Sequence, residues 1–368
     1  MNFEELMAYA KKTDCSDIHI TVGTNLALRR YGTLEILPDC PTAEESRNMI
    51  FAFLDQKQVE LVTSGEDLDV GCMLRDGTRI RANIYHQRNN LAASIRLLKQ
   101  EIPTFSQLGL PDVVRELSEM PRGLVLVTGP TGSGKSTTLY TALSELNREE
   151  VNIVTVEDPV EADIEGINQI QVNNKVDLTF ASALRSILRQ DPDIIMIGEI
   201  RDQETAGIAV QASITGHLVV STLHTNNAVG TLNRMADMGV ERYLIADSVV
   251  GVIAQRLVRK LCPHCRKMRP ASEEEKRILR QNTDQEVNIY EPAGCKLCNN
   301  TGFFGRIGVF EIMEVNEEIR NLIAENGTTE ELEEAAKRSG MRTLRQNGIR
   351  YVLDGTTSIE EMLKASYE

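Results

Sequence analysis

Short, almost continuous apolar runs dominate the middle of the chain. They are "GLVLVTG", "NIVTV", "DIIMIGE" and "GHLVVSTLH", and segments with helical spacing separate them at 134–147, 178–190 and 202–214. Strands that are buried on both faces and alternate with helices form a parallel sheet. The pattern therefore predicts an α/β domain built around such a sheet.

The first hundred residues follow another pattern. Residues 2–12 place four apolar side chains on one helical face, and residues 79–98 alternate as two strands around the polar turn "QRNN". This pattern predicts a small α+β domain at 1–98. A linker with two prolines and a glycine follows at 99–112, and the α/β domain then extends over 113–368.

The end of the chain divides again. We expect an irregular subdomain at 259–305, which carries paired cysteines after a predicted helix "IAQRLVRKL". Charged helices are expected over 314–368.

Composition narrows the function classes. The 368 residues are 41% hydrophobic and 26% charged, as in ordinary globular proteins. No apolar run approaches 18 residues, and the start is acidic and amphipathic, so we expect a cytoplasmic chain without a signal peptide. A net charge of −14 argues against nucleic-acid binding as the main activity.

The segment "GPTGSGKS" fits the phosphate-loop pattern G-x-x-x-x-G-K-[ST]. It follows an apolar strand and opens a helix, which is the context that separates this motif from a chance glycine-rich turn. Backbone N–H groups and the helix N-terminus would hold phosphates, Lys135 would reach the β- and γ-phosphates, and Ser136 would ligate Mg²⁺. We predict ATP as the nucleotide. The predicted contacts are Gly129, Pro130, Thr131, Gly132, Ser133, Gly134, Lys135, Ser136 and Thr137.

Acidic residues follow two of the buried strands. Glu199 ends "DIIMIGE", at the sheet edge where ligands bind in such folds, so we predict that it orients or deprotonates the attacking water. Glu157, Asp158 and Glu161 in "VEDPVE" are candidates for contacts with metal or water. One of these three acids could simply be solvated.

Two histidines flank the strand in "GHLVVSTLHT". A lone histidine is usually structural, but one at the end of a central strand could sense the γ-phosphate. His224, at the C-terminal end, is the better candidate, and His217 is the alternative.

Four segments together resemble the type II/type IV secretion ATPase superfamily. They are "GLVLVTGPTGSGKSTTLYTAL", "VTVEDPVE", "ILRQDPDIIMIGEIRDQETA" and "TGHLVVSTLHTNNA", which match its Walker A motif, aspartate box, Walker B motif and histidine box. The resemblance covers roughly residues 15–365 and is most specific in 123–260. It implies a hexameric ring ATPase whose subunits link a PAS-like N-terminal domain to a RecA-like domain. It also implies that Arg81 and Arg96 reach the nucleotide; without it, both would be read as surface arginines.

The four paired cysteines predict a zinc site. Cys262 and Cys265 form one Cys-x-x-Cys pair, and Cys295 and Cys298 form the other. Two such pairs suit tetrahedral zinc with four thiolates, which leaves no position open for water and makes the metal structural. The alternatives are a redox pair, unliganded cysteines, or His264 as a competing ligand.

The resemblance gives two indications about whether the motor assembles or retracts a fibre. The N-terminal hundred residues are similar to pilus retraction ATPases, whereas "KLCPHCRKM", "GCKLCNNTGFFGRIGVFEIMEV" and the C-terminal segment resemble assembly and secretion ATPases. We therefore predict a motor that works with an inner-membrane platform protein, at the inner face of the membrane, to assemble type IV pili or type II secretion pseudopili. Pilus retraction is the first alternative. A DNA-uptake or DNA-transport motor and a non-motor nucleotide switch are the others.

Overall fold

The computed structural model describes residues 1–30, 33–98 and 101–366, which form two compact units. The first unit comprises Met1–Glu101 with the short segment Glu161–Asp163. The second comprises Ile102–Val160 and the chain from Ile164 onward. The predicted linker begins at residues 99–100, which lie outside the described residues, and the rest of it contains a short helix and the start of another.

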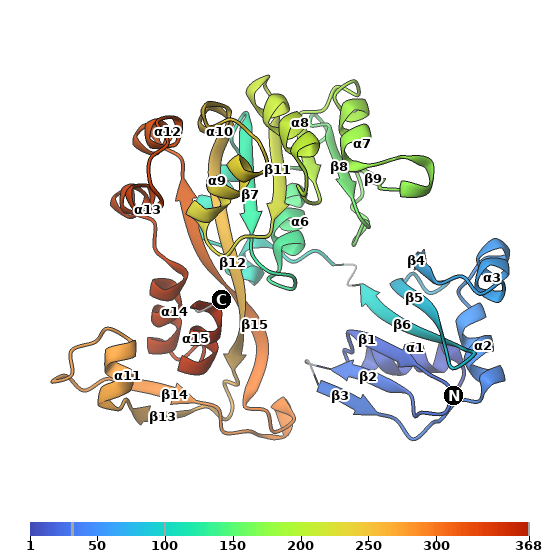
Figure 1. Ribbon diagram of the computed structural model, residues 1–368. Coiled ribbons are helices and arrows are strands. Elements are labelled where there is room, and N and C mark those ends of the chain that lie inside the picture. The colour runs from blue at the N-terminus through green and yellow to red at the C-terminus, as the bar shows by residue number, and fades with distance from the viewer. Residues whose placement is uncertain (31–32, 99–100, 367–368) are drawn as a thin grey trace. The chain divides into compact units, whose positions relative to one another are not determined.

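The first unit is an antiparallel sheet with the strand order β3-β2-β1-β6-β5-β4, together with three helices (Figure 1). Its strands alternate as the sequence predicts, because Ile80, Ala82 and Ile84 are buried while the side chains between them face outward. The elements are α1 (Phe3–Lys12), β1 (Asp17–Ile20), β2 (Ala27–Arg30), β3 (Thr33–Ile36), α2 (Ala43–Phe51), α3 (Gln56–Thr63), β4 (Leu68–Met73), β5 (Arg79–Gln87) and β6 (Asn90–Leu98).

The second unit contains a sheet with the order β15-β12-β7-β11-β10-β8-β9. All neighbouring strands are parallel except β12 and β15, so the predicted α/β fold with a parallel sheet is confirmed. The strands are β7 (Gly123–Thr128), β8 (Ile153–Glu157), β9 (Asn168–Gln171), β10 (Ile194–Ile197), β11 (Leu218–Leu223), β12 (Val249–Leu261) and β15 (Phe303–Glu314).

Helices pack against this sheet, and their apolar side chains form one large core with β7, β8, β10, β11 and β12. The predicted helices at 134–147, 178–190 and 202–214 are α6, α7 and α8. The helices are α4 (Phe105–Leu108), α5 (Asp112–Ser118), α6 (Lys135–Leu146), α7 (Phe180–Ile187), α8 (Gln203–Ile214), α9 (Ala228–Asp237), α10 (Arg242–Ser248), α12 (Glu317–Ala324), α13 (Thr329–Arg338), α14 (Leu344–Leu353), α15 (Ile359–Ser366) and the 3-10 turn η1 (Asn174–Val176).

The segment before the first cysteine pair corrects a prediction. "IAQRLVRKL" is not the end of a helix but part of β12, which pairs with β7 from Val249 to Ala254 and with β15 from Gly251 to Leu261. Residues 262–305 are also more regular than expected, because a small two-stranded sheet forms there. Its elements are β13 (Lys267–Pro270), α11 (Glu273–Ile278), β14 (Asn288–Glu291) and η2 (Lys296–Cys298).

Within residues 1–30, 33–98 and 101–366, no helix combines the length and the apolar character that crossing a membrane requires.

Candidate nucleotide site and metal centre

The phosphate-loop segment lies where β7 ends and α6 begins. Gly129, Gly132 and Gly134 have positive φ values of 146°, 81° and 89°, which glycine adopts without strain. At Gly129, a Cβ would overlap the carbonyl oxygen of Gln255. Glycine is therefore required here both for the backbone conformation and for the close approach of β12.

The loop has the features of a phosphate cradle. The ammonium of Lys135 is buried and donates to the carbonyl oxygens of Gly129 (2.8 Å) and Pro130 (3.1 Å). The Ser133 hydroxyl is buried without a hydrogen-bond partner among the described residues. Thr131, Gly132 and Thr137 are exposed, and Ser136 is half-buried in the first turn of α6. The cation, the unsatisfied hydroxyl and the accessible loop together fit a bound triphosphate and its magnesium.

The sequence analysis missed Gln255, which braces the loop from β12. Its amide nitrogen donates to the Ser133 carbonyl (2.9 Å), and its amide oxygen accepts from the Thr138 hydroxyl (2.8 Å). The neighbouring Arg256 is also buried and donates to the Asn226 carbonyl (3.1 Å). A signal was present, because two large polar side chains interrupt the apolar run "VIAQRLV".

Glu199 lies just beyond β10, at the same edge of the sheet as the phosphate loop. Its carboxylate is largely buried, forms an ion pair with Arg201 and lies 3.7 Å from Nε2 of His224. Burial and the positive charge of Lys135 lower the pKa of His224. The structure thus brings Lys135, Glu199 and His224 together at one end of the parallel strands.

His217 is placed elsewhere. It precedes β11, at the opposite end of the strand from His224, and its Nδ1 donates to the carbonyl oxygen of Ala212 (2.9 Å) near the end of α8. Six strand residues lie between the two histidines, so their backbones are about 23 Å apart along the strand. His217 therefore hydrogen-bonds to the last turn of α8 and lies apart from the phosphate loop.

The three acids of "VEDPVE" have three different surroundings. Glu157 is buried, and its carboxylate accepts hydrogen bonds from Tyr140, from Thr155 (2.6 Å) and from Gln169 (3.1 Å). Asp158 is exposed and lines a cavity of about 300 Å³ at the starts of α7 and α8. Glu161 is exposed in the segment Glu161–Asp163, which groups with the first unit.

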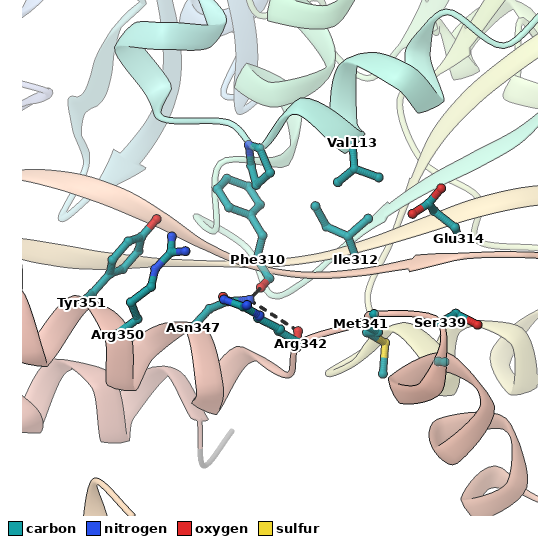
Figure 2. Close-up of a pocket in the computed structure, with 13 residues that line it drawn as sticks. Val113, Phe310, Ile312, Glu314, Ser339, Met341, Arg342, Asn347, Arg350 and Tyr351 are labelled. Carbon is teal, nitrogen blue, oxygen red and sulfur yellow. Dashed lines mark hydrogen bonds between the residues drawn. The ribbon is translucent and has the colours of Figure 1, made fainter. Parts of the chain in front are cut away.

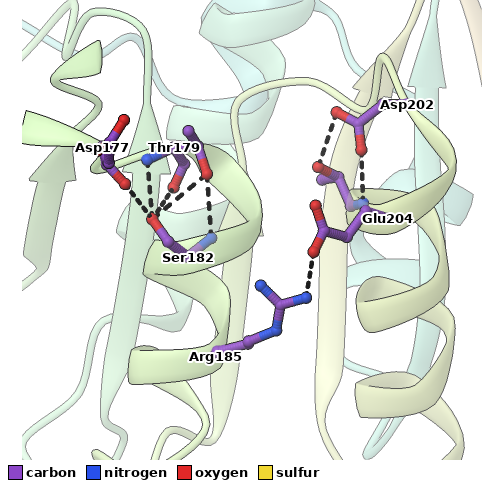
Figure 3. A network of polar contacts seen from close by, with 7 residues as sticks. Asp177, Thr179, Ser182, Arg185, Asp202 and Glu204 are labelled. Carbon is purple, nitrogen blue, oxygen red and sulfur yellow. Dashed lines mark hydrogen bonds and ion pairs between the residues drawn. The ribbon is translucent and has the colours of Figure 1, made fainter. Parts of the chain in front are cut away.

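Polar contacts fix the walls of the cavity beside Asp158 (Figure 3). The Asp202 carboxylate accepts from the Thr205 backbone N–H (2.8 Å) and caps α8, while Thr179 and Ser182 form a capping box on α7. Arg185 and Glu204 form an ion pair between the two helices. These contacts hold the start of α8 close behind Glu199 and Arg201.

Arg81 and Arg96 lie opposite each other on β5 and β6 of the first unit, and both are exposed. Nε of Arg96 donates to Asp17 (2.9 Å) on β1. Burial opposes ionisation of Asp17, but hydrogen bonds from Arg96 and Ser16 outweigh it and lower its pKa. The two predicted arginines are therefore neighbours on the outward face of one sheet.

The four cysteines of the predicted metal site converge. Their Sγ atoms all lie within 4.8 Å of one another, with separations of 3.9 Å for Cys262–Cys295, 3.8 Å for Cys265–Cys298 and 3.7 Å for Cys295–Cys298. A tetrahedron with zinc–sulfur bonds of about 2.3 Å has edges of about 3.8 Å. The cluster therefore fits a zinc ion, and the geometry does not favour an isolated redox pair.

Backbone N–H groups favour the thiolate form of one of the four cysteines, Cys298, whereas burial raises the pKa of Cys265. Cys295 and Gly302 donate to Sγ of Cys298 at 3.2 and 3.3 Å. Burial would raise the pKa of Cys298, but these N–H groups outweigh it and lower the pKa to about 6. His264 is exposed and is not part of the cluster.

Comparisons with known proteins agree on one family. The family model described as "Type II/IV secretion system protein" matches residues 5–364. The type II secretion system protein E of Aeromonas hydrophila is 42% identical over 99% of this chain and 74% of its own length. The type II secretion system protein HxcR of Pseudomonas aeruginosa is 44% identical over 98% of this chain and 76% of its own.

Solved structures give the same result. The pilus retraction motor PilT with bound ADP superposes with a TM-score of 0.80 at 33% identity, and the match covers 100% of this chain and 98% of that one. The ATPase DotB of Legionella pneumophila has a TM-score of 0.75 at 23% identity over 98% of this chain and 94% of its own, which supports the fold alone.

Proposed function

This chain belongs to the type II/IV secretion system protein family and is an ATPase, and we propose that it powers the assembly of type IV pili or type II secretion pseudopili. The observation that carries the hydrolytic part of the proposal is the convergence of Lys135, Glu199 and His224 at the end of the parallel strands, and the secretion proteins among the relatives support the assembly part. A cation, a carboxylate and a neutral imidazole beside a phosphate loop are suited to stabilising charge and positioning water at a γ-phosphate.

We assign one role to each part of the site. The loop from Gly129 to Gly134 presents its N–H groups to the phosphates, and Ser136 is the protein ligand of Mg²⁺. Magnesium held there would neutralise charge that develops on the phosphate oxygens. Glu199 orients the attacking water and accepts its proton, while His224 faces the γ-phosphate.

The remaining candidates follow from their surroundings. Asp158 and Glu161 are exposed, so they stay candidates for contacts with magnesium-bound water. Glu157 already accepts hydrogen bonds from three neutral donors, and we assign it to bracing α6 against β8 and β9. Arg81 and Arg96 stay candidates for stabilising transition-state charge.

The larger assembly is also part of the proposal. A homohexamer at the cytoplasmic face of the inner membrane would pass the motion of its domains to a platform protein. Zinc at the four cysteines would hold the fold of residues 259–305 and take no part in hydrolysis. We propose no direct contact with nucleic acid, because the chain carries a net charge of −14.

Pilus retraction is a second candidate function. The observation in its favour is the likeness to the pilus retraction motor PilT over the whole chain. The four-cysteine cluster and the secretion proteins among the relatives favour assembly.

Two experiments test the proposal. Lys135→Ala should reduce ATP hydrolysis at least about 100-fold, because it removes the cation aimed at the transferred phosphate, whereas Lys260→Ala, an exposed lysine on β12, should leave it unchanged. Normal turnover by Lys135→Ala would refute the site. Deleting the gene should abolish surface pili or secretion, and excess pili would instead assign the motor to retraction.

A further inference from the structure

The edge of the second unit's sheet at β15 has no part in the proposed function. Among the described residues, β15 pairs with β12 alone. A cleft of about 310 Å³ lies along this edge, lined by the start of α5, by β15, by the residues that follow α13 and by α14. Figure 2 shows Val113 on one side of β15, and Met341, Arg342 and Asn347 on the other.

The register of β15 determines which backbone groups point into the cleft. The N–H of Val315 donates to the carbonyl oxygen of Val250 (3.0 Å), so these two residues form a hydrogen-bonded pair. Hydrogen-bonded and non-hydrogen-bonded pairs alternate along an antiparallel ladder. Phe310, Ile312 and Glu314 therefore turn their N–H and C=O groups away from β12 and toward the open edge.

One end of this edge is already occupied. The side-chain amide of Asn347 donates to the carbonyl oxygen of Phe310 (2.7 Å), as the register requires of an outward carbonyl. For the outward backbone groups of Ile312 and Glu314, the described part of the chain supplies no partner. Such an edge is a template for one more strand.

The side chains around the cleft select the kind of strand. Val113, Ile312 and Met341 give it apolar walls. Arg342 and Arg350 are exposed, and within the described ranges neither forms an ion pair with a carboxylate, although the Arg350 guanidinium lies over the Tyr351 ring at 5.6 Å. Glu314 is the one acid among the lining residues. In a chain with a net charge of −14, a cleft lined by two arginines and one carboxylate is locally positive, and this favours an acidic occupant.

We propose that this cleft binds an extended acidic segment of a partner protein, which pairs with Ile312 and Glu314 as an additional strand of the sheet. Backbone hydrogen bonds would supply affinity. Alternating apolar side chains would pack against Val113 and Met341, and carboxylates would pair with Arg342 and Arg350. The segment needs about five or six residues, which is the usual length of a strand. This proposal is independent of the hydrolytic site.

A labelled peptide tests the proposal on the full chain. The probe is a capped peptide of about six residues that alternates valine and glutamate. Its fluorescence anisotropy should show saturable binding that weakens with added salt. Arg342→Glu should weaken binding about tenfold, because it replaces an attraction by a repulsion. Arg306→Glu, an exposed arginine on the same strand outside the cleft, should not.

A backbone variant isolates the pairing. Ile312→Pro removes the outward N–H together with the Ile312 side chain, and it leaves the ladder to β12 intact because proline is tolerated where the N–H points off an edge strand. Ile312→Ala, which keeps the N–H, is the matched control for the lost side chain. Ile312→Pro should weaken probe binding about three- to tenfold while ATP hydrolysis stays normal, which also shows that the variant folds.

Three outcomes would overturn the proposal. They are no saturable binding up to about 1 mM probe, equal binding of a valine–lysine peptide, and equal binding by Ile312→Pro and the unmodified chain. A fourth would reassign the cleft: if Ile312→Pro and Arg342→Glu change the assembly state instead of probe binding, the edge is an interface between copies of this chain.

Discussion

The nucleotide site and the four-cysteine cluster are both supported by β12. The polar groups of the nucleotide site are open to water, whereas the sulfurs of the cluster face one another. At the nucleotide site, β12 supplies Gln255 beside a loop whose residues Thr131 and Gly132 are exposed. Glu199 pairs there with Arg201 and His224, two side chains that water reaches. At the other end, the same strand leads into Cys262, whose sulfur lies in a closed group of four.

The difference follows from what each site must do. A hydrolytic site needs an open position for water and phosphate, so its charges cannot all be satisfied by the protein. A structural metal site is stable because its ligands fill every coordination position. Removing a charged group should therefore cost activity in the first region and stability in the second.

The largest effect is expected at Glu199. Glu199→Gln keeps the shape of the side chain but removes the base, so kcat for ATP hydrolysis should fall about 100- to 1,000-fold while ATP binding and thermal stability stay normal. Steady-state hydrolysis and nucleotide titration measure this. Glu149→Gln, the same substitution at an exposed acid beyond the end of α6, is the matched control and should keep normal kcat. A Glu199→Gln protein that hydrolyses ATP normally would remove Glu199 from catalysis.

The reverse pattern is expected at Cys298. The purified chain should hold about one zinc, and Cys298→Ser should lose it and destabilise residues 259–305 by at least about 3 kcal/mol, with hydrolysis kept within about tenfold. Metal analysis and hydrogen exchange of that segment are the measurements. Cys40→Ser, an exposed cysteine outside the cluster, should retain zinc. If Cys298→Ser keeps its zinc, the four-thiolate assignment is wrong.

A substitution of Glu157 tests whether the role of a side chain follows from its surroundings or from its position in a sequence motif. It lies in the acidic motif of the nucleotide region, but its carboxylate is as enclosed as the cysteines. Glu157→Gln places amide hydrogens against groups that donate to it, so unfolding free energy should fall by about 2 kcal/mol while kcat changes less than tenfold. Chemical denaturation and steady-state kinetics separate the two quantities. Asp158→Asn, a substitution at the exposed neighbouring position, is the control and should leave stability unchanged. If Glu157→Gln instead loses much of its kcat and none of its stability, Glu157 takes part in catalysis.

The sequence was sufficient for features whose signal lies in adjacent residues. The phosphate loop is one continuous motif between a strand and a helix, and the strands of the parallel sheet are continuous apolar runs. The presence of two Cys-x-x-Cys pairs also predicts that they form one site, because zinc needs four ligands.

The features that the sequence did not predict depend on contacts between neighbouring elements of the sheet. "IAQRLVRKL" has helix-forming residues, but pairing with β7 and β15 makes it a strand, since tertiary contacts override weak local propensity. The role of Gln255 depends on the approach of β12 to the phosphate loop, and the enclosure of Glu157 depends on Tyr140 and Gln169 from other elements. Periodicity along the chain carries no information about such neighbours.

The smallest expected effect concerns the ion pair that fixes β12 between the two regions. Arg259 donates to Glu361 on α15 through both its guanidinium (2.7 Å) and its backbone N–H (3.0 Å). Burial would raise the pKa of Glu361, but hydrogen bonds from Arg259 and Lys364 outweigh it and lower the pKa to about 2. Because the folded pKa lies below the unfolded value, the carboxylate stabilises the fold above about pH 4.5 and loses this contribution as the pH falls toward 2.

We therefore expect Glu361→Gln to reduce unfolding free energy by about 1 kcal/mol at pH 6 and by much less near pH 3, since the unmodified carboxylate has by then lost most of its advantage. Chemical denaturation of both proteins at the two pH values gives the difference, which cancels the titration of all other acids. Glu360→Gln, at a neighbouring exposed position, is the control and should show no such pH dependence. A constant difference between Glu361→Gln and the unmodified chain would mean that Glu361 acts through packing, and that its charge does not hold β12 in place between the two sites.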